Sequence, residues 1–520
     1  MRSRRRFQFM WAVMVGSVAG LVAVSFQLAL NYLEFLRSEL VALLRVQGWG
    51  PTLTYPLLAM AIVALVAWGT RKFCPEAAGS GIPHIKGVLM GVRDLKSLRL
   101  IIVKFLGGIL AIGSGLSLGR EGPTVQMGGA IGQIFASRMG MSSKGAPLLI
   151  AVGAGAGLSA AFNAPLAGFL FVMEELHFEF APLPYISALA ASITGDLVSR
   201  LMSGQLPSLI VFSYSTPQLT KLPWFVLLGV LSGCLAILFK ESLVRGIRLL
   251  DHHQPVMGWV LPLLAGCAGG LAVLVLPEVA GGGHVTTENI LNGNFSTQEG
   301  FGFIFLLLVS KFLLTQICYL ARVPGGIFAP MLVIGGLLGY GLGIIQGYFS
   351  PGFEAHPAIF AVIGMASFFS GVVHAPLTGV VLVMEMTSNF KLLFPMMAAS
   401  LVAFTISEWW GEAPVYEALL AEELRRSGPP QLIFQEPTCI HAIVNEGSEM
   451  DQRTIGEIDL PEGALIVCIN RNGQKSVPSG KSMLCSGDDL EIMISGEISP
   501  CLQEIRELAM VKKTEDPLPG

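Results

Sequence analysis

Charged residues are scarce in this chain of 520 residues: they make up 13% of it, while 52% of the residues are hydrophobic. A soluble domain usually carries about 25% charged residues. Residues 1–424 hold 24 basic and 21 acidic residues, and residues 425–520 hold nine basic and fifteen acidic ones. We therefore expect an apolar membrane domain followed by an acidic soluble domain. The nearly balanced total charge favours no nucleic-acid partner.

Cysteine is also rare, and its pattern argues against a metal site. The eight cysteines are scattered, and no CxxC or CxxH pair is present. The chain also has no HExxH or GxSxG motif, which a membrane protease would need. The glycine run at 153–157 is typical of helix packing, because no strand pattern precedes it. We therefore expect neither an enzyme nor a bound cofactor or metal.

The apolar domain contains several runs long enough to cross a bilayer, which takes about 20 residues per helix. Examples are Ile101–Leu118, Leu222–Phe239, Val260–Leu276 and Phe301–Leu320. Many other segments are short, glycine-rich or interrupted by proline. Such helices are tolerated in a membrane when their free backbone groups line a protected cavity. We predict an all-α, multi-pass protein whose tilted helices are partly discontinuous.

The N-terminus, Met1–Arg6, is strongly basic and runs into an apolar helix near Phe9. A cleaved signal peptide is one interpretation. We favour a retained first helix, because arginines hold a terminus on the cytoplasmic side. The four cysteines of the tail, as free thiols, also suit a reducing cytoplasm.

Two sequence patterns occur twice and divide the membrane domain into halves of about 1–220 and 221–424. The first pair is GREGPTVQMGGAIG at 119–132 and GIFAPMLVIGGLLG at 326–339; the second is NAPLAG at 163–168 and HAPLTG at 374–379. Each copy of the second pattern continues to a Val-Met-Glu that ends at Glu174 or Glu385. Convergent packing of small residues is the alternative explanation. Homologous halves are typical of transporters, whose substrate site lies between the repeats.

Three segments have the composition that a membrane anion site requires. They are Gly79–Pro83 (GSGIP), Gly119–Pro123 (GREGP) and Gly326–Pro330 (GIFAP). Helix N-termini offer unpaired N–H groups and a partial positive charge, which bind an anion without holding it as tightly as lysine or arginine would. Glycine lets the backbone approach the ion, and proline suits the first turn of a helix.

These three segments, in this order, resemble the signature segments of the CLC family of chloride channels and exchangers. A fourth segment, GEAPVY at 411–416, resembles that family's last membrane helix with its ion-binding tyrosine. The resemblance covers about residues 10–420. It implies a homodimer in the lipid bilayer, with one pore per subunit and two inverted halves.

The resemblance also implies the site residues. The central anion would be bound by the hydroxyls of Ser80 and Tyr416 and by backbone N–H groups of Ile327 and Phe328; an outer anion would be bound by N–H groups around Arg120, Glu121 and Gly122. Taken alone, Ser80 fits a helix N-cap and Tyr416 fits an anchor at the membrane interface.

Glu121 stands among backbone groups suited to anions, so its carboxylate can itself occupy an anion position. Once protonated it is neutral and can move away, which would make it the external gate and proton acceptor. A salt bridge to Arg120 is the alternative. We expect the two side chains to point apart, because neighbouring residues of a helix do not face each other.

Two adjacent carboxylates, Glu174 and Glu175, follow the apolar run 169–173. Carboxylates inside a membrane are costly and usually functional. Glu174 aligns with Glu385 in the repeat, whereas Glu175 aligns with Met386. We therefore expect Glu174 to be structural and Glu175 to be specialised, and the resemblance assigns Glu175 to internal proton transfer.

Lysines are the candidate partners of Glu175 in the apolar domain, and Lys86 and Lys104 are the two that we consider. Many bacterial exchangers of the family carry acidic residues where this chain has His84 and Lys86. This departure affects the expected delivery of protons from the inner side.

The tail, residues 425–520, reads as a small α+β domain. Expected strands are Gln431–Gln435, Ala464–Asn470 and Leu490–Ser495, with a tight hairpin turn at Arg471–Gln474. About 70 residues resemble the C-terminal half of RCK/TrkA-type regulatory domains, which dimerise and bind small ligands. A module for dimerisation or stability alone is the alternative.

The sequence thus predicts a chloride/proton antiporter of a bacterial inner (plasma) membrane, with the N-terminus and the C-terminal domain in the cytoplasm. A passive chloride channel with the same pore is the nearest alternative, and Glu175 argues against it. A fluoride-selective transporter is a further alternative. A membrane regulator of potassium traffic would leave the three anion segments unexplained.

Overall fold

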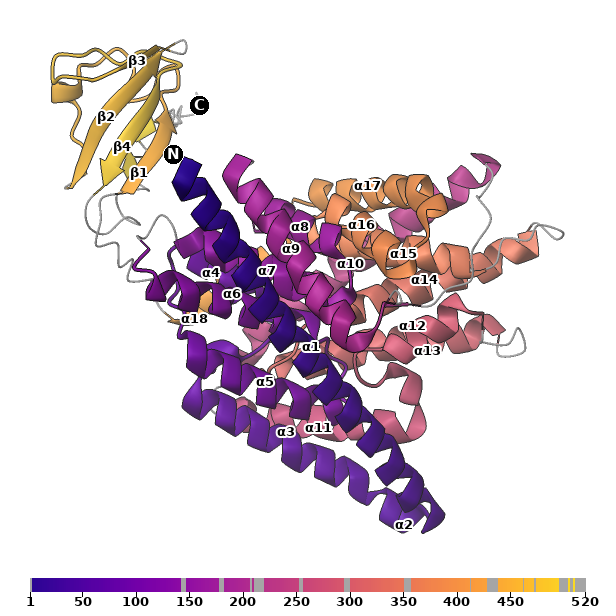
Figure 1. Ribbon diagram of the computed structural model, residues 1–520. Coiled ribbons are helices and arrows are strands. Elements are labelled where there is room, and N and C mark those ends of the chain that lie inside the picture. Colours follow the sequence, from indigo (N-terminus) through magenta and orange to yellow (C-terminus); the bar gives the residue numbers. More distant parts are fainter. Residues whose placement is uncertain are drawn as a thin grey trace, which may run out of the picture. The chain divides into compact units, whose positions relative to one another are not determined.

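The computed structural model describes residues 2–141, 146–176, 182–205, 208–209, 219–251, 256–293, 300–349, 357–411, 413–427, 438–461, 463–471, 474–494, 504–505 and 508–509. The chain divides into two compact units. Residues 1–89 and 94–426 form a helical unit, and residues 90–93 and 427–520 form a unit that carries a small β-sheet (Figure 1).

The first half of the helical unit runs from a long helix, α1, to α9. Its elements are α1 (Arg2–Val46), α2 (Trp49–Thr52), α3 (Thr54–Phe73), η1 (Pro75–Ala77), α4 (Ile82–Leu89), α5 (Ser97–Gly113), α6 (Glu121–Arg138), α7 (Ala146–Phe162), α8 (Pro165–Glu174) and α9 (Pro182–Ser203). The glycine run at 153–157 lies inside α7, which confirms the prediction that it belongs to a helix.

The second half repeats this order. Its elements are η2 (Leu219–Lys221), α10 (Leu222–Asp251), α11 (Val256–Val275), η3 (Pro277–Val279), α12 (His284–Leu291), α13 (Gly300–Leu320), α14 (Phe328–Phe349), α15 (Pro357–Val373), α16 (Pro376–Thr387), η4 (Phe390–Leu392) and α17 (Leu393–Trp409), and α18 (Val415–Ser427) follows. Within the described residues, seven helices are long and apolar enough to cross a membrane. The protein is therefore a multi-pass membrane protein of mixed long and short helices, as predicted.

The repeat extends beyond the two patterns identified from the sequence. The segment PEAAGSG at 75–81 recurs as PEVAGGG at 277–283. Each copy forms a short 3-10 helix and then an eight-residue helix, which are η1 and α4 in the first half and η3 and α12 in the second. The two halves therefore share their local backbone structure as well as their sequence patterns.

Two repeat-related carboxylates show that the halves are inverted. Glu174, at the end of α8, accepts hydrogen bonds from the backbone N–H groups of Leu377 (3.1 Å) and Thr378 (2.7 Å) at the start of α16. Glu385, near the end of α16, accepts them from Leu166 (3.1 Å) and Ala167 (2.8 Å) at the start of α8. Each helix therefore ends where the other begins, so the two lie antiparallel. This confirms the prediction that Glu174 is structural.

Glycines bring the central helices into backbone contact. A β-carbon at Gly128 of α6 would collide with the carbonyl of Gly153 of α7, and one at Gly335 of α14 would collide with that of Gly364 of α15. These two pairs are repeat-related. Close packing of this kind is a usual way for membrane helices to associate, so the same glycine contact holds the core of each half together.

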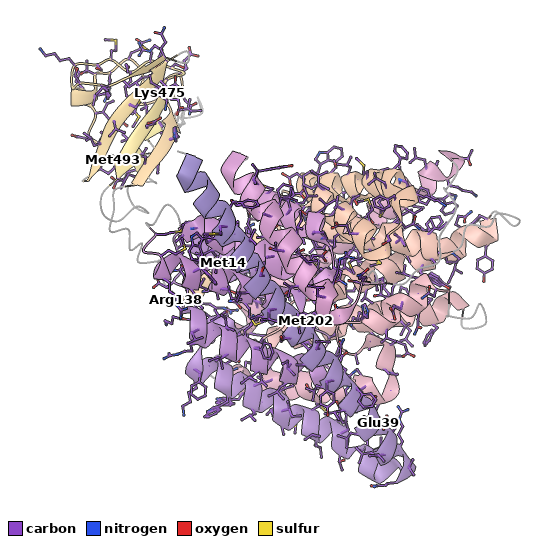
Figure 2. All side chains as sticks on the ribbon, viewed as in Figure 1. Met14, Glu39, Arg138, Met202, Lys475 and Met493 are labelled. Atoms are coloured by element: carbon purple, nitrogen blue, oxygen red, sulfur yellow. The ribbon has the colours of Figure 1, made fainter. Side chains whose placement is uncertain are left out.

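The second unit contains a four-stranded antiparallel sheet in the order β1-β4-β2-β3. The strands are β1 (Thr438–Ile443), β2 (Ala464–Arg471), β3 (Gln474–Ser476) and β4 (Asp489–Ile494). Figure 2 labels Lys475 on β3 and Met493 on β4. The strands predicted at 464–470 and 490–495 are confirmed to within a residue. The strand predicted at 431–435 lies outside the described residues.

The predicted hairpin agrees with the pairing of β2 and β3, in which Arg471 lies opposite Gln474; residues 472 and 473 lie outside the described residues. Arg471 also donates from two nitrogens to both carboxylate oxygens of Asp488, each at 2.7 Å. These hydrogen bonds hold the pKa of Asp488 below its usual value. The ion pair thus links β2 to the turn that precedes β4.

Candidate functional site

The three glycine segments meet through their backbones. Gly119 and Gly326 exchange two hydrogen bonds, of 2.6 and 2.8 Å. The N–H of Gly79 donates to the carbonyl of Val323, and the N–H of Gly325 donates to the carbonyl of Gly79, both at 3.1 Å. The loops before α4, α6 and α14 therefore form one cluster, which places the starts of three helices at a common point.

Glycine is required at two places in this cluster. Gly81 has a φ of +87°, which favours glycine, and a β-carbon there would collide with Gln126. A β-carbon at Gly122 would collide with the side-chain and backbone oxygens of Ser80. The segments GSGIP and GREGP are thus in direct contact, with the hydroxyl of Ser80 against the first turn of α6.

Ser80 and Tyr416 supply two buried hydroxyls to this point. Tyr416 is 0% exposed and Ser80 is 1% exposed. Within the described residues, neither hydroxyl has a partner at hydrogen-bonding distance and angle. The two side chains are nonetheless close enough to interact. An unpaired buried hydroxyl is costly, so a bound anion that accepts both hydrogen bonds fits these residues.

The alternatives for these two residues are not supported. Ser80 does not use its hydroxyl to cap a helix, because that oxygen has no partner in the described part of the chain. Tyr416 is not an interfacial anchor, because it is among the largest fully buried side chains of the protein. Both side chains instead face the meeting point of the three loops.

Glu121 begins α6 and is buried. Its Oε2 lies over Gly119, and the carboxylate interacts with its own backbone N–H and with that of Ala329, the second residue of α14. The carboxylate thus lies at the N-terminus of α14, where a helix presents unpaired N–H groups. Ala329 was not among the predicted site residues. The predicted Ile327 and Phe328 are both 0% exposed at the start of the same helix.

The prediction that Arg120 and Glu121 point apart is wrong. Arg120 Nε lies 3.9 Å from Glu121 Oε1. Arg120 is the residue before the first turn of α6, so the helical spacing on which the prediction rested does not apply to it. The long guanidinium side chain also reaches the carbonyl of Ala161, at 3.5 Å. At 3.9 Å the two groups form a long ion pair without a direct hydrogen bond.

A cavity of about 540 Å³ leads to Glu121. Its lining includes Asn31, Glu34 and Arg37 of α1 together with Arg120. Since an α-helix rises about 1.5 Å per residue, these α1 residues lie about a bilayer's thickness from the arginine-rich start of that helix. Figure 2 shows Met14 and Glu39 well separated along α1. The cavity therefore reaches Glu121 from the membrane side opposite the N-terminus.

Glu175 lies at the other end of the site, as the residue that directly follows the last turn of α8. Its Oε1 accepts a hydrogen bond from Lys86 Nζ at 2.9 Å, and both side chains are almost fully buried. Lys86 also bonds Glu417 of α18 at 3.1 Å. Tyr416 interacts electrostatically with both Glu175 and Glu121. Tyr416 thus lies within electrostatic reach of both carboxylates.

Lys104 is not a partner of Glu175, contrary to one of the two options considered. Its Nζ donates to the carbonyls of Ala77 (3.0 Å) and Gly79 (2.7 Å). Lys311 makes the repeat-related contacts, to the carbonyls of Val279 (3.0 Å) and Gly281 (2.8 Å). The two lysines are therefore structural. The recurrence of Lys104 as Lys311, at the same spacing of 207 residues as the glycine segments, was the available sequence signal.

His84, on α4 beside Lys86, has both ring nitrogens within hydrogen-bonding distance of a partner. Nε2 lies 3.1 Å from the carbonyl of Asp94, and Nδ1 lies 3.2 Å from Nε2 of Gln126. The residue is buried and helps to fix α4 against α6. Glu417 was missed by the sequence analysis, and no pattern marked it, because a charged residue on a short amphipathic helix is ordinarily solvent-facing.

A metal does not account for this arrangement. In the described ranges no group of three or more His, Cys, Asp and Glu residues is placed to hold a metal ion. The site instead combines helix N-termini, two hydroxyls and two buried carboxylates. Such a site can bind a small anion and can hold a proton at either of two positions.

Comparisons with known proteins identify the architecture. A family model described as "Voltage gated chloride channel" matches residues 62–408. The H(+)/Cl(−) exchange transporter ClcA of Vibrio cholerae is 37% identical over 427 residues, which cover 80% of this chain and 89% of that protein. The crystal structure of a slow cyanobacterial Cl−/H+ antiporter superposes with a TM-score of 0.76 at 33% identity, covering 81% of this chain and 98% of that one. A CLC-type fluoride/proton antiporter, at 21% identity with a TM-score of 0.65 and covering 79% of this chain and 97% of that one, shares the fold alone.

Proposed function

We propose that this chain, which belongs to the voltage gated chloride channel family, exchanges chloride for protons across a membrane as a secondary active transporter. One observation carries the proposal: two buried carboxylates, Glu121 and Glu175, both lie within electrostatic reach of the unpaired hydroxyl of Tyr416. An anion binder alone requires the hydroxyls and helix N-termini. Two buried carboxylates in addition are what proton coupling requires.

Each residue has a distinct part in this mechanism. Chloride would accept hydrogen bonds from Ser80 and Tyr416, with backbone N–H groups of Ile327 and Phe328 completing the central site. The backbone around Arg120 and Gly122 would hold a second anion when Glu121 is protonated and moves away. Glu121 would therefore open the external path and carry a proton at the same moment. Glu175 would supply or accept that proton from the inner side.

The alternative of a passive channel has no specific observation in its favour. A channel needs no carboxylate behind the central site, yet Glu175 is retained there and paired with Lys86 in a buried environment. The relatives named as exchangers support the same choice. The presence of Ser80 argues against a fluoride-selective transporter.

We further propose a homodimer in a bacterial inner membrane, with the N-terminus and the C-terminal unit in the cytoplasm. The arginine-rich start of the chain supports this orientation. The four-stranded sheet is compatible with an RCK-like regulatory domain that binds a small ligand. We assign transport to the helical unit and place its boundary after Arg426 rather than at residue 424.

The decisive experiment measures both ions in liposomes that contain the purified protein. An outward chloride gradient should drive protons inward against their own gradient, followed with a pH electrode beside a chloride electrode. Chloride efflux without proton movement would leave a channel as the better description. Absence of both fluxes, with the protein folded and dimeric, would contradict either form of anion transport.

A further inference from the structure

Lys86 is shared between two carboxylates that differ in their access to water. Its Nζ lies 2.9 Å from Oε1 of Glu175 and 3.1 Å from Oε1 of Glu417. The Lys86 and Glu175 side chains are 1% and 3% exposed, whereas that of Glu417 is 34% exposed. Hydrogen bonds thus connect a buried carboxylate, a buried amine and a solvent-accessible carboxylate, in that order.

We infer that Glu417, through Lys86, is the route by which protons pass between the inner solution and Glu175. This inference rests on the proposed exchange function and assigns a further proton-carrying residue to it. The Glu417 carboxylate would be the entry group, because it alone of the three touches solvent to a substantial extent. Its position next to Tyr416 on α18 brings this entry group to the central site.

The transfer balances without any further reactant. A hydronium ion of the inner solution protonates Glu417 and leaves as water; the Lys86 ammonium gives one proton to the Glu175 carboxylate, and the neutral amine then takes the proton of Glu417. One O–H bond breaks at Glu417 and one forms at Glu175, while lysine ends as it began. Burial makes the neutral intermediate accessible, since two opposite charges are costly to keep in an apolar interior. Reversal of these steps releases a proton.

Three described titratable groups near Glu175 and Lys86 are engaged elsewhere. Glu174, which neighbours Glu175, is bonded to the start of α16. The ring nitrogens of His84 lie against the Asp94 carbonyl and Gln126. Lys104 is bonded to the carbonyls of Ala77 and Gly79. Among the described residues, the ion-pair partners of Lys86 are the two carboxylates of Glu175 and Glu417.

The test compares three variants in liposomes by proton and chloride flux. Glu417→Gln keeps the shape of the side chain but cannot carry a proton, so proton flux should fall at least about tenfold while chloride flux remains. Glu417→Asp should retain part of the proton flux. Glu423→Gln is the matched control on the same helix, since Glu423 is also half-buried while the ion pairs of Lys86 are those with Glu175 and Glu417, and it should match the wild type.

Two further measurements separate proton carriage from a structural role. The exposure of Glu417 means that a high concentration of a small buffer such as MES should restore proton flux in Glu417→Gln and leave the wild type unchanged. Lys86→Arg keeps the positive charge but does not release its proton, so it should lose proton flux while chloride flux remains.

The outcomes distinguish this inference from the exchange function itself. A wild type that moves no protons would overturn the exchanger. A wild type that couples normally, with Glu417→Gln as fast as Glu423→Gln, would overturn the relay and leave the exchanger intact. Equal loss of chloride and proton flux in Glu417→Gln, or full proton flux in Lys86→Arg, would also overturn the relay.

Discussion

The two halves of the membrane unit share one framework and differ in the groups that line the anion path. Glu174 and Glu385 bond each other's helices, and Lys104 and Lys311 bond equivalent loop carbonyls. These paired residues satisfy backbone groups that both halves expose at broken helices. A residue kept in both copies therefore serves the backbone structure common to them.

The positions that differ are those to which we assign chemistry. By the repeat alignment, the two carboxylates of the site correspond to apolar residues: Glu121 to Phe328 and Glu175 to Met386. Ser80 corresponds to Gly282, and Lys86 corresponds to Glu288. Each first-half residue is buried. The first half therefore supplies Glu121, Glu175 and the hydroxyl of Ser80, whereas we assign backbone N–H groups of Ile327 and Phe328 to the second half and a second hydroxyl to Tyr416 of α18.

The largest effect that tests this asymmetry is expected at Glu121. Glu121→Gln resembles the protonated gate, so proton exchange should fall by about a hundredfold or more and most pH dependence should disappear, while chloride still moves. Parallel flux measurements at several external pH values would check this. Proton pumping at the wild-type rate would remove Glu121 from the proton path.

Glu175→Gln should stop proton movement to a similar extent, but for a different reason. Because we place Glu121, and not Glu175, in the proposed anion path, the gate of this variant should still respond to external pH. The measurement is chloride flux as a function of external pH, beside proton flux. Retained uphill pumping would be the most damaging result, since the exchanger would then lack its internal proton site.

The shared carboxylates should behave oppositely. Glu174→Gln and Glu385→Gln should each lower stability by about 2 kcal/mol, because each loses charge-assisted hydrogen bonds to a helix start. The two losses should be similar, and the ratio of chloride to protons should be unchanged. Thermal unfolding in detergent and coupled flux together test this. Uncoupling by Glu174→Gln without loss of stability would break the distinction between shared and unique residues.

A smaller effect is expected from Tyr416, whose hydroxyl we propose as one of several donors to the anion. Tyr416→Phe should weaken chloride binding by about 1 kcal/mol, or roughly fivefold. Tyr416→Ala should also loosen coupling without unfolding the protein. Calorimetric titration with chloride measures both variants. Unchanged affinity would place the anion away from this hydroxyl.

The smallest effect on transport is expected from removing the tail. Truncation after Ser427 keeps Arg425 and Arg426, which pair with Glu422 and Asp251 of the helical unit. Coupled flux should then remain close to that of the full chain, because every anion-binding segment precedes this point. A truncated protein that folds but carries no chloride would make the tail part of the transport machinery.

Some features of the site followed from local pattern. Glycine and proline in three segments of an apolar chain predicted helix starts, because these residues have few other uses together in a membrane. The repeat alone indicated that Glu174 has a structural role and Glu175 a specialised one, because only Glu174 recurs in the second half. The hydrogen bonds of Glu174 agree with a structural role. The strands at 464–470 and 490–495 likewise followed from the β-branched and apolar residues in each.

The amino-acid sequence by itself determined the membrane character, the internal repeat and the glycine segments, since these depend on hydropathy, spacing and backbone freedom within short stretches of chain. Only the tertiary structure decided which charged groups meet. It brought Arg120 beside Glu121, turned Lys104 to loop carbonyls and placed Lys86 between Glu175 and Glu417, which lie 242 residues apart. Long side chains can reach many partners from one backbone position, so the choice among them depends on how distant helices pack.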